Sequence, residues 1–172
     1  MPFLEEKFNL NIYSMEHEEW TKIVISDELF QQITEKFGLR YRFEDYKIDV
    51  VLAGCANLIY EQYDDRFWPL ERLVLVEHES FIENVIEELY KLLYWRAPLK
   101  VFISYPSQSS KKSIDDYMKT FAEIIKRSNK WFPENSETQY LFIIGQMNES
   151  RKGLKWQAYV IDTEGNIELL TE

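Results

Sequence analysis

Residues 73–79 read Leu-Val-Leu-Val-Glu-His-Glu, and this stretch decides the fold. Four consecutive apolar residues predict a strand that is buried on both faces of a sheet. Glu77 and Glu79 stand two residues apart at the end of that strand, so their side chains point to the same face. Carboxylates crowded beside a core repel one another and lose hydration. They therefore take up protons, pair with cations or bind a metal.

A further carboxylate lies upstream in the segment 47–52, which reads Lys-Ile-Asp-Val-Val-Leu. We expect this segment to be a strand with Asp49 near its start. If the two strands are neighbours in the sheet, Asp49, Glu77 and Glu79 converge at one place. His78 alternates with the two glutamates, so we expect it on the opposite face as a partly buried histidine.

Helices and strands follow one another along most of the chain. Apolar periodicity and capping residues predict helices from Glu28 to Phe37, from Phe81 to Trp95 and from Ser113 to about Ser128. Strands are expected at Phe8–Ile12, Leu39–Phe43, Lys47–Ala53, Leu70–Glu79, Leu99–Tyr105, Gln139–Ile144, Lys155–Asp162 and Asn166–Leu170. The strand–helix–strand order between residues 70 and 105 implies a crossover between parallel strands. The fold class is therefore α/β (α+β), with a mixed central β-sheet flanked by helices.

Two of the predicted helices carry clear end signals. Ser26 or Asp27 is suited to cap the start of the first helix, and Gly38 follows its last residue. Ser113 and Asp116 form a capping-box variant, with Asp where Glu is usual.

The length and charge of the chain predict one acidic domain. The chain has 172 residues and a formal net charge of −10, from 20 basic and 30 acidic side chains. This balance argues against a general polyanion binder, because phosphate contacts need clustered Lys and Arg, although a small basic patch on an acidic body still suits nucleic acid.

The single cysteine, Cys55, cannot form an internal disulfide, which fits a reducing cytoplasmic location. We expect neither a signal peptide nor membrane association, because no basic leader or long apolar run is present.

The order helix, strand, strand with Asp49, strand with Glu77 and Glu79, helix, strand resembles the core of the restriction-endonuclease-like, or PD-(D/E)XK nuclease, superfamily. In that superfamily an acidic residue on the second core strand and a Glu on the third strand bind a divalent metal. A Lys two residues after the Glu positions or activates the attacking water. Here Ile48 stands where Pro is usual, and Glu79 stands where Lys is expected.

The resemblance covers residues 27–105. The length of the chain predicts a single domain over residues 1–172, and the resemblance implies a restriction-endonuclease-like core within it. Residues 1–26 and 106–172 are then elaborations that add N- and C-terminal strands.

The resemblance also implies a site. Asp49, Glu77 and Glu79 would be the ligands of Mg²⁺ or Mn²⁺, which prefer hard oxygen donors. Glu79 would be another ligand or a base for the water. Lys47 is the candidate replacement for the motif lysine, because it precedes Asp49 by two residues on the same strand face. Lys91 is a poorer candidate, because it lies opposite the apolar stripe of its helix.

Two functions from different classes follow. The resemblance implies a metal-dependent nuclease of the bacterial type, or a nuclease-derived protein, acting on phosphodiester bonds in DNA or RNA. The alternative is a non-catalytic protein-interaction module that retains the fold, with aromatic residues at 60–68 serving a protein partner or a homodimer. Two simpler interpretations of Glu77 and Glu79 also stay open. They are solvated residues at a strand end, or they form a buried ion pair with Lys47 or Lys100.

Overall fold

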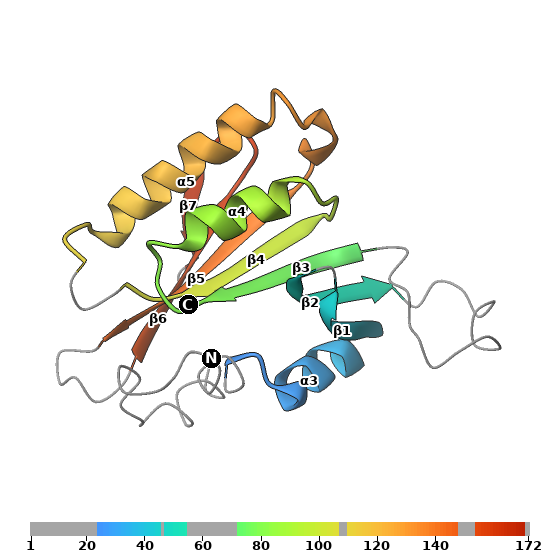
Figure 1. The fold of residues 1–172 in the computed structure, drawn as a ribbon. Helices are drawn as coiled ribbons and strands as arrows, with labels where there is room; N and C mark the ends of the chain where they lie inside the picture. Colours follow the sequence, from blue (N-terminus) through green and yellow to red (C-terminus); the bar gives the residue numbers. More distant parts are fainter. Residues whose placement is uncertain (1–23, 46, 55–71, 107–109, 148–153, 171–172) are drawn as a thin grey trace.

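The computed structural model describes residues 24–45, 47–54, 72–106, 110–147 and 154–170, and these form a mixed α/β fold around one seven-stranded sheet (Figure 1). The elements in chain order are α3 (Asp27–Phe37), β1 (Leu39–Asp45), β2 (Ile48–Gly54), β3 (Arg72–Glu79), α4 (Val85–Leu93), β4 (Leu99–Ser104), α5 (Ile114–Ser128), the 3-10 helix η3 (Pro133–Asn135), β5 (Gln139–Met147), β6 (Leu154–Ile161) and β7 (Ile167–Leu170). The mixed sheet with flanking helices is confirmed. The strand expected at Phe8–Ile12 lies outside the described residues.

The sheet has its strands in chain order, from β1 at one edge to β7 at the other. β1, β2 and β3 form an antiparallel meander, and β5, β6 and β7 form another. Between them β3, β4 and β5 run parallel, with Val76 beside Val101 and Glu79 beside Ser104. The crossover predicted from residues 70–105 is confirmed, because α4 connects the parallel strands β3 and β4.

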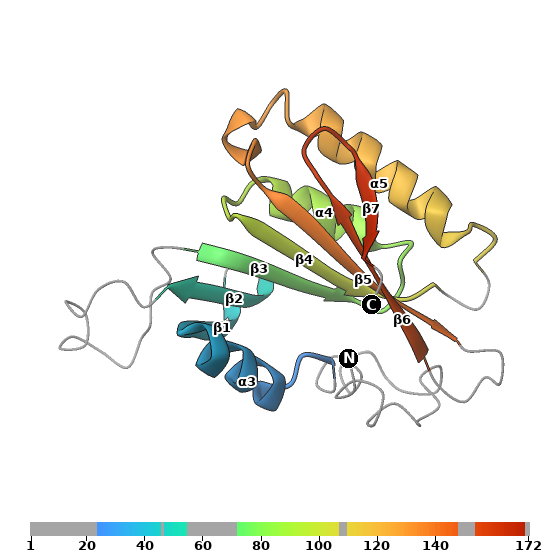
Figure 2. The same cartoon turned by 180° about the vertical axis from the view of Figure 1, so that it is seen from behind.

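Helices cover both faces of this sheet. α4 and α5 lie on one face, and α3 lies on the other beside β1 and β2 (Figures 1 and 2). The core under α4 and α5 contains an aromatic stack in which the Phe142 ring lies 4.9 Å from the Phe102 ring and 5.1 Å from the Phe121 ring. The core under α3 is built on Phe30 with aliphatic side chains of β2, β3 and β4. Alternation along β2, β3 and β4 therefore divides their apolar residues between two buried layers, as expected for strands buried on both faces.

The capping predictions are confirmed where the structure tests them. Ser26 is the N-cap of α3, and its hydroxyl accepts a hydrogen bond from the Leu29 N–H. Gly38 ends α3 in the left-handed region, at φ 65°, which glycine adopts without steric cost. At α5 the Ser113 hydroxyl accepts from the Asp116 N–H, and the Asp116 carboxylate accepts from the Ser113 N–H.

The helix predicted from Phe81 begins four residues later, at Val85. A turn occupies the intervening residues, in which the Ile82 N–H donates to the Tyr105 carbonyl at 2.9 Å. The turn therefore fastens the start of α4 to the end of β4. This places the whole of α4 above the parallel strands and beside β3.

Candidate functional site

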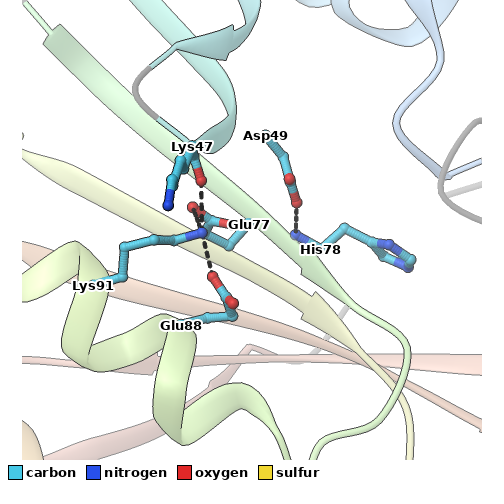
Figure 3. A network of polar contacts seen from close by, with 6 residues as sticks. All are labelled: Lys47, Asp49, Glu77, His78, Glu88 and Lys91. Carbon is cyan, nitrogen blue, oxygen red and sulfur yellow. Dashed lines mark hydrogen bonds and ion pairs between the residues drawn. The ribbon is translucent and has the colours of Figure 1, made fainter. Parts of the chain in front are cut away.

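The structure brings Asp49 and Glu77 together on neighbouring strands. Val50 pairs with Val76 and Val51 with Leu75 between β2 and β3, so the next position in this register sets Asp49 opposite Glu77. Both residues lie on the face covered by α4, because they alternate with Val50 and Val76 of the α3 layer. The backbone N–H of His78 donates to Asp49 Oδ2 at 2.7 Å, which fixes the Asp49 carboxylate against β3 (Figure 3).

A lysine from α4 completes the cluster. Lys91 Nζ lies 2.8 Å from Glu77 Oε1 and donates to the backbone carbonyl of Lys47 at 2.7 Å. It also forms an ion pair with Glu88, one turn earlier in the helix (Figure 3). Of the alternatives left open for Glu77, a buried ion pair is the one that the structure contains, with Lys91 as the partner in place of Lys47 or Lys100.

Glu77 is deeply buried in this cluster, with 2 % of its side chain exposed, and this rules out the interpretation of Glu77 as a solvated strand-end residue. Burial, together with the charge of Asp49, raises the pKa of Glu77 to about 9 against the opposing effect of Lys91. Burial also raises the pKa of Asp49, although the hydrogen bond from His78 opposes this. The pair consequently retains a proton near neutral pH.

The pKa of Lys91 is raised although the side chain is partly buried. Desolvation lowers the pKa of its ammonium, but the hydrogen bonds to Glu77 and Glu88 outweigh that effect, so the pKa is raised overall. Lys91 is therefore a permanent cation at neutral pH. This one ammonium contacts the carboxyl groups of Glu77 and Glu88, and its charge also acts on Asp49, so the cluster is richer in acid than in compensating positive charge.

Glu79 and Lys47 have other surroundings. Glu79 Oε1 accepts from the Phe81 N–H at 3.3 Å and from Asn84 Nδ2 at 3.4 Å, so it holds the turn before α4. Lys47 adopts a left-handed backbone conformation, with φ at 65°, and precedes the first residue of β2. Strand alternation therefore does not extend to Lys47. Its side chain is exposed, and its contribution to the cluster is its backbone carbonyl.

His78 and Lys100 lie away from this cluster. His78 is buried on the α3 face, with its ring 6.3 Å from that of Tyr105, as predicted from alternation. Lys100 is fully buried near the start of β4, where Nζ donates to Asn135 Oδ1 at 3.1 Å and lies over the Tyr140 ring. Cys55 and the aromatic segment 60–68 lie outside the described residues.

The geometry reduces the predicted set of three carboxylates to a central pair. Within the part of the chain that the structure describes, no three or more His, Cys, Asp or Glu side chains converge as a metal site. The sequence did not indicate Glu88 as a neighbour of the pair, nor the contact between Lys91 and Glu77. The spacing of Glu88 and Lys91 shows only that the two side chains are neighbours, since residues three apart on a helix share one flank.

Comparisons with known proteins add no assignment. No protein-family model matches the chain, and no curated protein matches it. In the described ranges no helix has both the length and the apolar character needed to cross a membrane.

Proposed function

We propose that this chain is a divergent restriction-endonuclease-like protein that cleaves phosphodiester bonds with a divalent metal held by Asp49 and Glu77. The single observation that carries the proposal is the convergence of Asp49, Glu77 and Lys91 from β2, β3 and α4. The element order α3-β1-β2-β3-α4-β4 supports it, because this order is the one that the resemblance implies. Lys91 would take the part of the motif lysine that Glu79 replaces.

The residues of the cluster suit Mg²⁺ or Mn²⁺. Mg²⁺ is commonly bound by one or two carboxylates and keeps several waters, so a pair is a sufficient protein contribution. The surplus of carboxyl groups over cations also favours a further positive charge. When bound, the metal would lower the pKa of a coordinated water and stabilise negative charge on the phosphate.

The chain's own residues have separable tasks in this proposal. The hydrogen bond from His78 N–H holds the Asp49 carboxylate in one orientation. Lys91 presents an ammonium beside Glu77, where it would pair with an anionic phosphate oxygen. Its half-buried side chain reaches the cluster from a helix, so the chain can move it without disturbing the sheet.

Cleavage of labelled single- and double-stranded DNA and RNA, with Mg²⁺ or Mn²⁺, tests this function. We expect metal-dependent cleavage that Asp49→Asn and Glu77→Gln both abolish. Glu87→Gln is the matched control, because Glu87 is an exposed acid on the same helix as Lys91. Absence of cleavage of every substrate by the folded wild-type protein would refute catalysis.

One observation favours the second candidate, a non-catalytic interaction module. Trp131 and Tyr94 are 81 % and 74 % exposed, and the Tyr94 ring lies 5.3 Å from that of Phe132. Phe132 follows Trp131 in the chain, and exposed aromatic side chains are typical of protein interfaces. Self-association that Trp131→Ser weakens, measured by sedimentation velocity, would favour this candidate with a second copy of the chain as the partner.

A further inference from the structure

Three oxygen atoms converge on one position that Lys91 Nζ occupies. They are the Lys47 backbone carbonyl at 2.7 Å, Glu77 Oε1 at 2.8 Å, and a Glu88 carboxylate oxygen (Figure 3). They come from three separate elements, namely the turn before β2, strand β3 and helix α4. Carboxylate and carbonyl oxygens are also the donors that hard divalent cations take. The position therefore has the surroundings of a cation site, and a cation that belongs to the chain occupies it.

Lys91 and a metal ion would compete for this position. Both are positive, and both would use the Glu77 carboxyl group, so simultaneous occupation brings like charges within a few ångströms of each other at a buried site. We propose that Lys91 is an internal cation that closes the metal site, and that its ammonium leaves Glu77 before a divalent ion binds there. This inference rests on the proposed function, since it assigns a regulatory device to the same site.

A phosphate group supplies the reason for Lys91 to move. The side chain of Lys91 is 27 % exposed, so its ammonium can turn from Glu77 toward solvent without unfolding the helix. An anionic phosphate offers it a new partner of similar strength. Binding of the phosphate would then free the oxygens for the metal, and binding of the metal would free Lys91 for the phosphate. Because such linkage is reciprocal, metal and phosphodiester would each strengthen the binding of the other.

Calorimetric titration with Mn²⁺ alone tests the closure. We expect Lys91→Met to bind Mn²⁺ at least about tenfold more tightly than the wild type, which corresponds to about 1.4 kcal/mol for displacing the ammonium from Glu77. Lys119→Met, at an exposed position of α5, should bind like the wild type. Equal or weaker Mn²⁺ binding by a folded Lys91→Met variant would overturn the proposal. If that variant does not fold, Lys91→Gln removes the charge and keeps a hydrogen-bonding side chain, and the same expectations apply.

A second titration in the presence of dimethyl phosphate tests the coupling. We expect this phosphodiester to raise the Mn²⁺ affinity of the wild type and to leave that of Lys91→Met unchanged. An equal increase in both proteins would overturn the coupling. The two proposals fail differently. Tighter Mn²⁺ binding by Lys91→Met with no cleavage by the wild type refutes the nuclease alone, whereas cleavage by the wild type with unchanged Mn²⁺ affinity in the variant refutes the closure alone.

Discussion

Replacement of Glu77 by Gln should stabilise the protein, and the gain should increase with pH. Glutamine has the shape of a protonated glutamate and can still accept a hydrogen bond from Lys91. Burial raises the pKa of Glu77 from its ordinary value of 4.5 to about 9, so folding takes up a proton at any pH between these two values. The stability associated with this proton is complete below the unfolded pKa and is lost as the pH rises toward the folded pKa.

The magnitude follows from the pH interval. Between about pH 5 and pH 8 the free energy of unfolding of the wild type falls relative to that of Glu77→Gln. Three pH units at about 1.4 kcal/mol each give an upper bound of about 4 kcal/mol for this fall. Asp49 shares the proton, and the Lys91 ammonium can approach a charged Glu77 and offset part of its cost. The measured difference should therefore be smaller than this bound but at least about 2 kcal/mol.

Urea unfolding at several pH values measures this difference directly. The free energy of unfolding of the wild type should fall, relative to that of Glu77→Gln, at each step from pH 5 to pH 8. The control, Glu87→Gln, should follow the wild type at every pH, because that side chain is exposed. A difference between wild type and Glu77→Gln that does not change with pH, or that changes in favour of the wild type, would refute a buried protonated Glu77.

Two further predictions concern the fold. Ser113→Ala removes the hydroxyl that accepts from the Asp116 N–H at the start of α5, so it should lower the free energy of unfolding by about 1 kcal/mol in denaturant unfolding. The exposed Lys112→Ala should be nearly neutral. Equal effects would show that the cap is not stabilising. Phe142→Ala opens a cavity in the centre of the aromatic stack and should cost about 3–5 kcal/mol by the same measurement, against less than about 1 kcal/mol for the exposed Trp131→Ala. A small loss at Phe142 would mean that the surrounding core collapses to fill the space.

The sequence predicted most of the described elements, because apolar periodicity and end signals agree along the chain. β3 contains the apolar run Leu73–Val76 and β4 the run Val101–Ile103, as expected for strands covered on both faces. α4 and α5 each divide into an apolar and a polar side. The start of α4 was placed too early. The segment from Phe81 to Asn84 has a helical apolar pattern, but Glu79 and the Tyr105 carbonyl accept its hydrogen bonds and hold it as a turn. Contacts from other elements decide such a boundary, and they are not visible in a local pattern.

The proximity of Asp49 and Glu77 could be predicted from the strand pattern of the sequence. Alternation fixes the face of Glu77, and a meander of two strands brings the start of β2 beside the end of β3. Glu79 shares that face, yet its position one pair further along puts it next to the turn before α4, where backbone and side-chain amides are the nearer partners. A shared face is therefore necessary for a shared site but does not establish one.

The lysine could not be identified from spacing alone, because two local features reverse the ranking of Lys47 and Lys91. Lys47 has φ at 65°, so it belongs to the turn, and the rule that residues two apart share a strand face stops at Ile48. Lys91 lies on the flank of α4, and a lysine side chain is long enough to reach past the apolar stripe to the sheet beneath. Whether it does so depends on where α4 crosses β3, and that crossing is fixed by packing across the whole core. A charged residue opposite an apolar stripe is usually solvated, but beside a buried carboxyl pair it becomes the nearest available cation, and this proximity places Lys91 in the cluster.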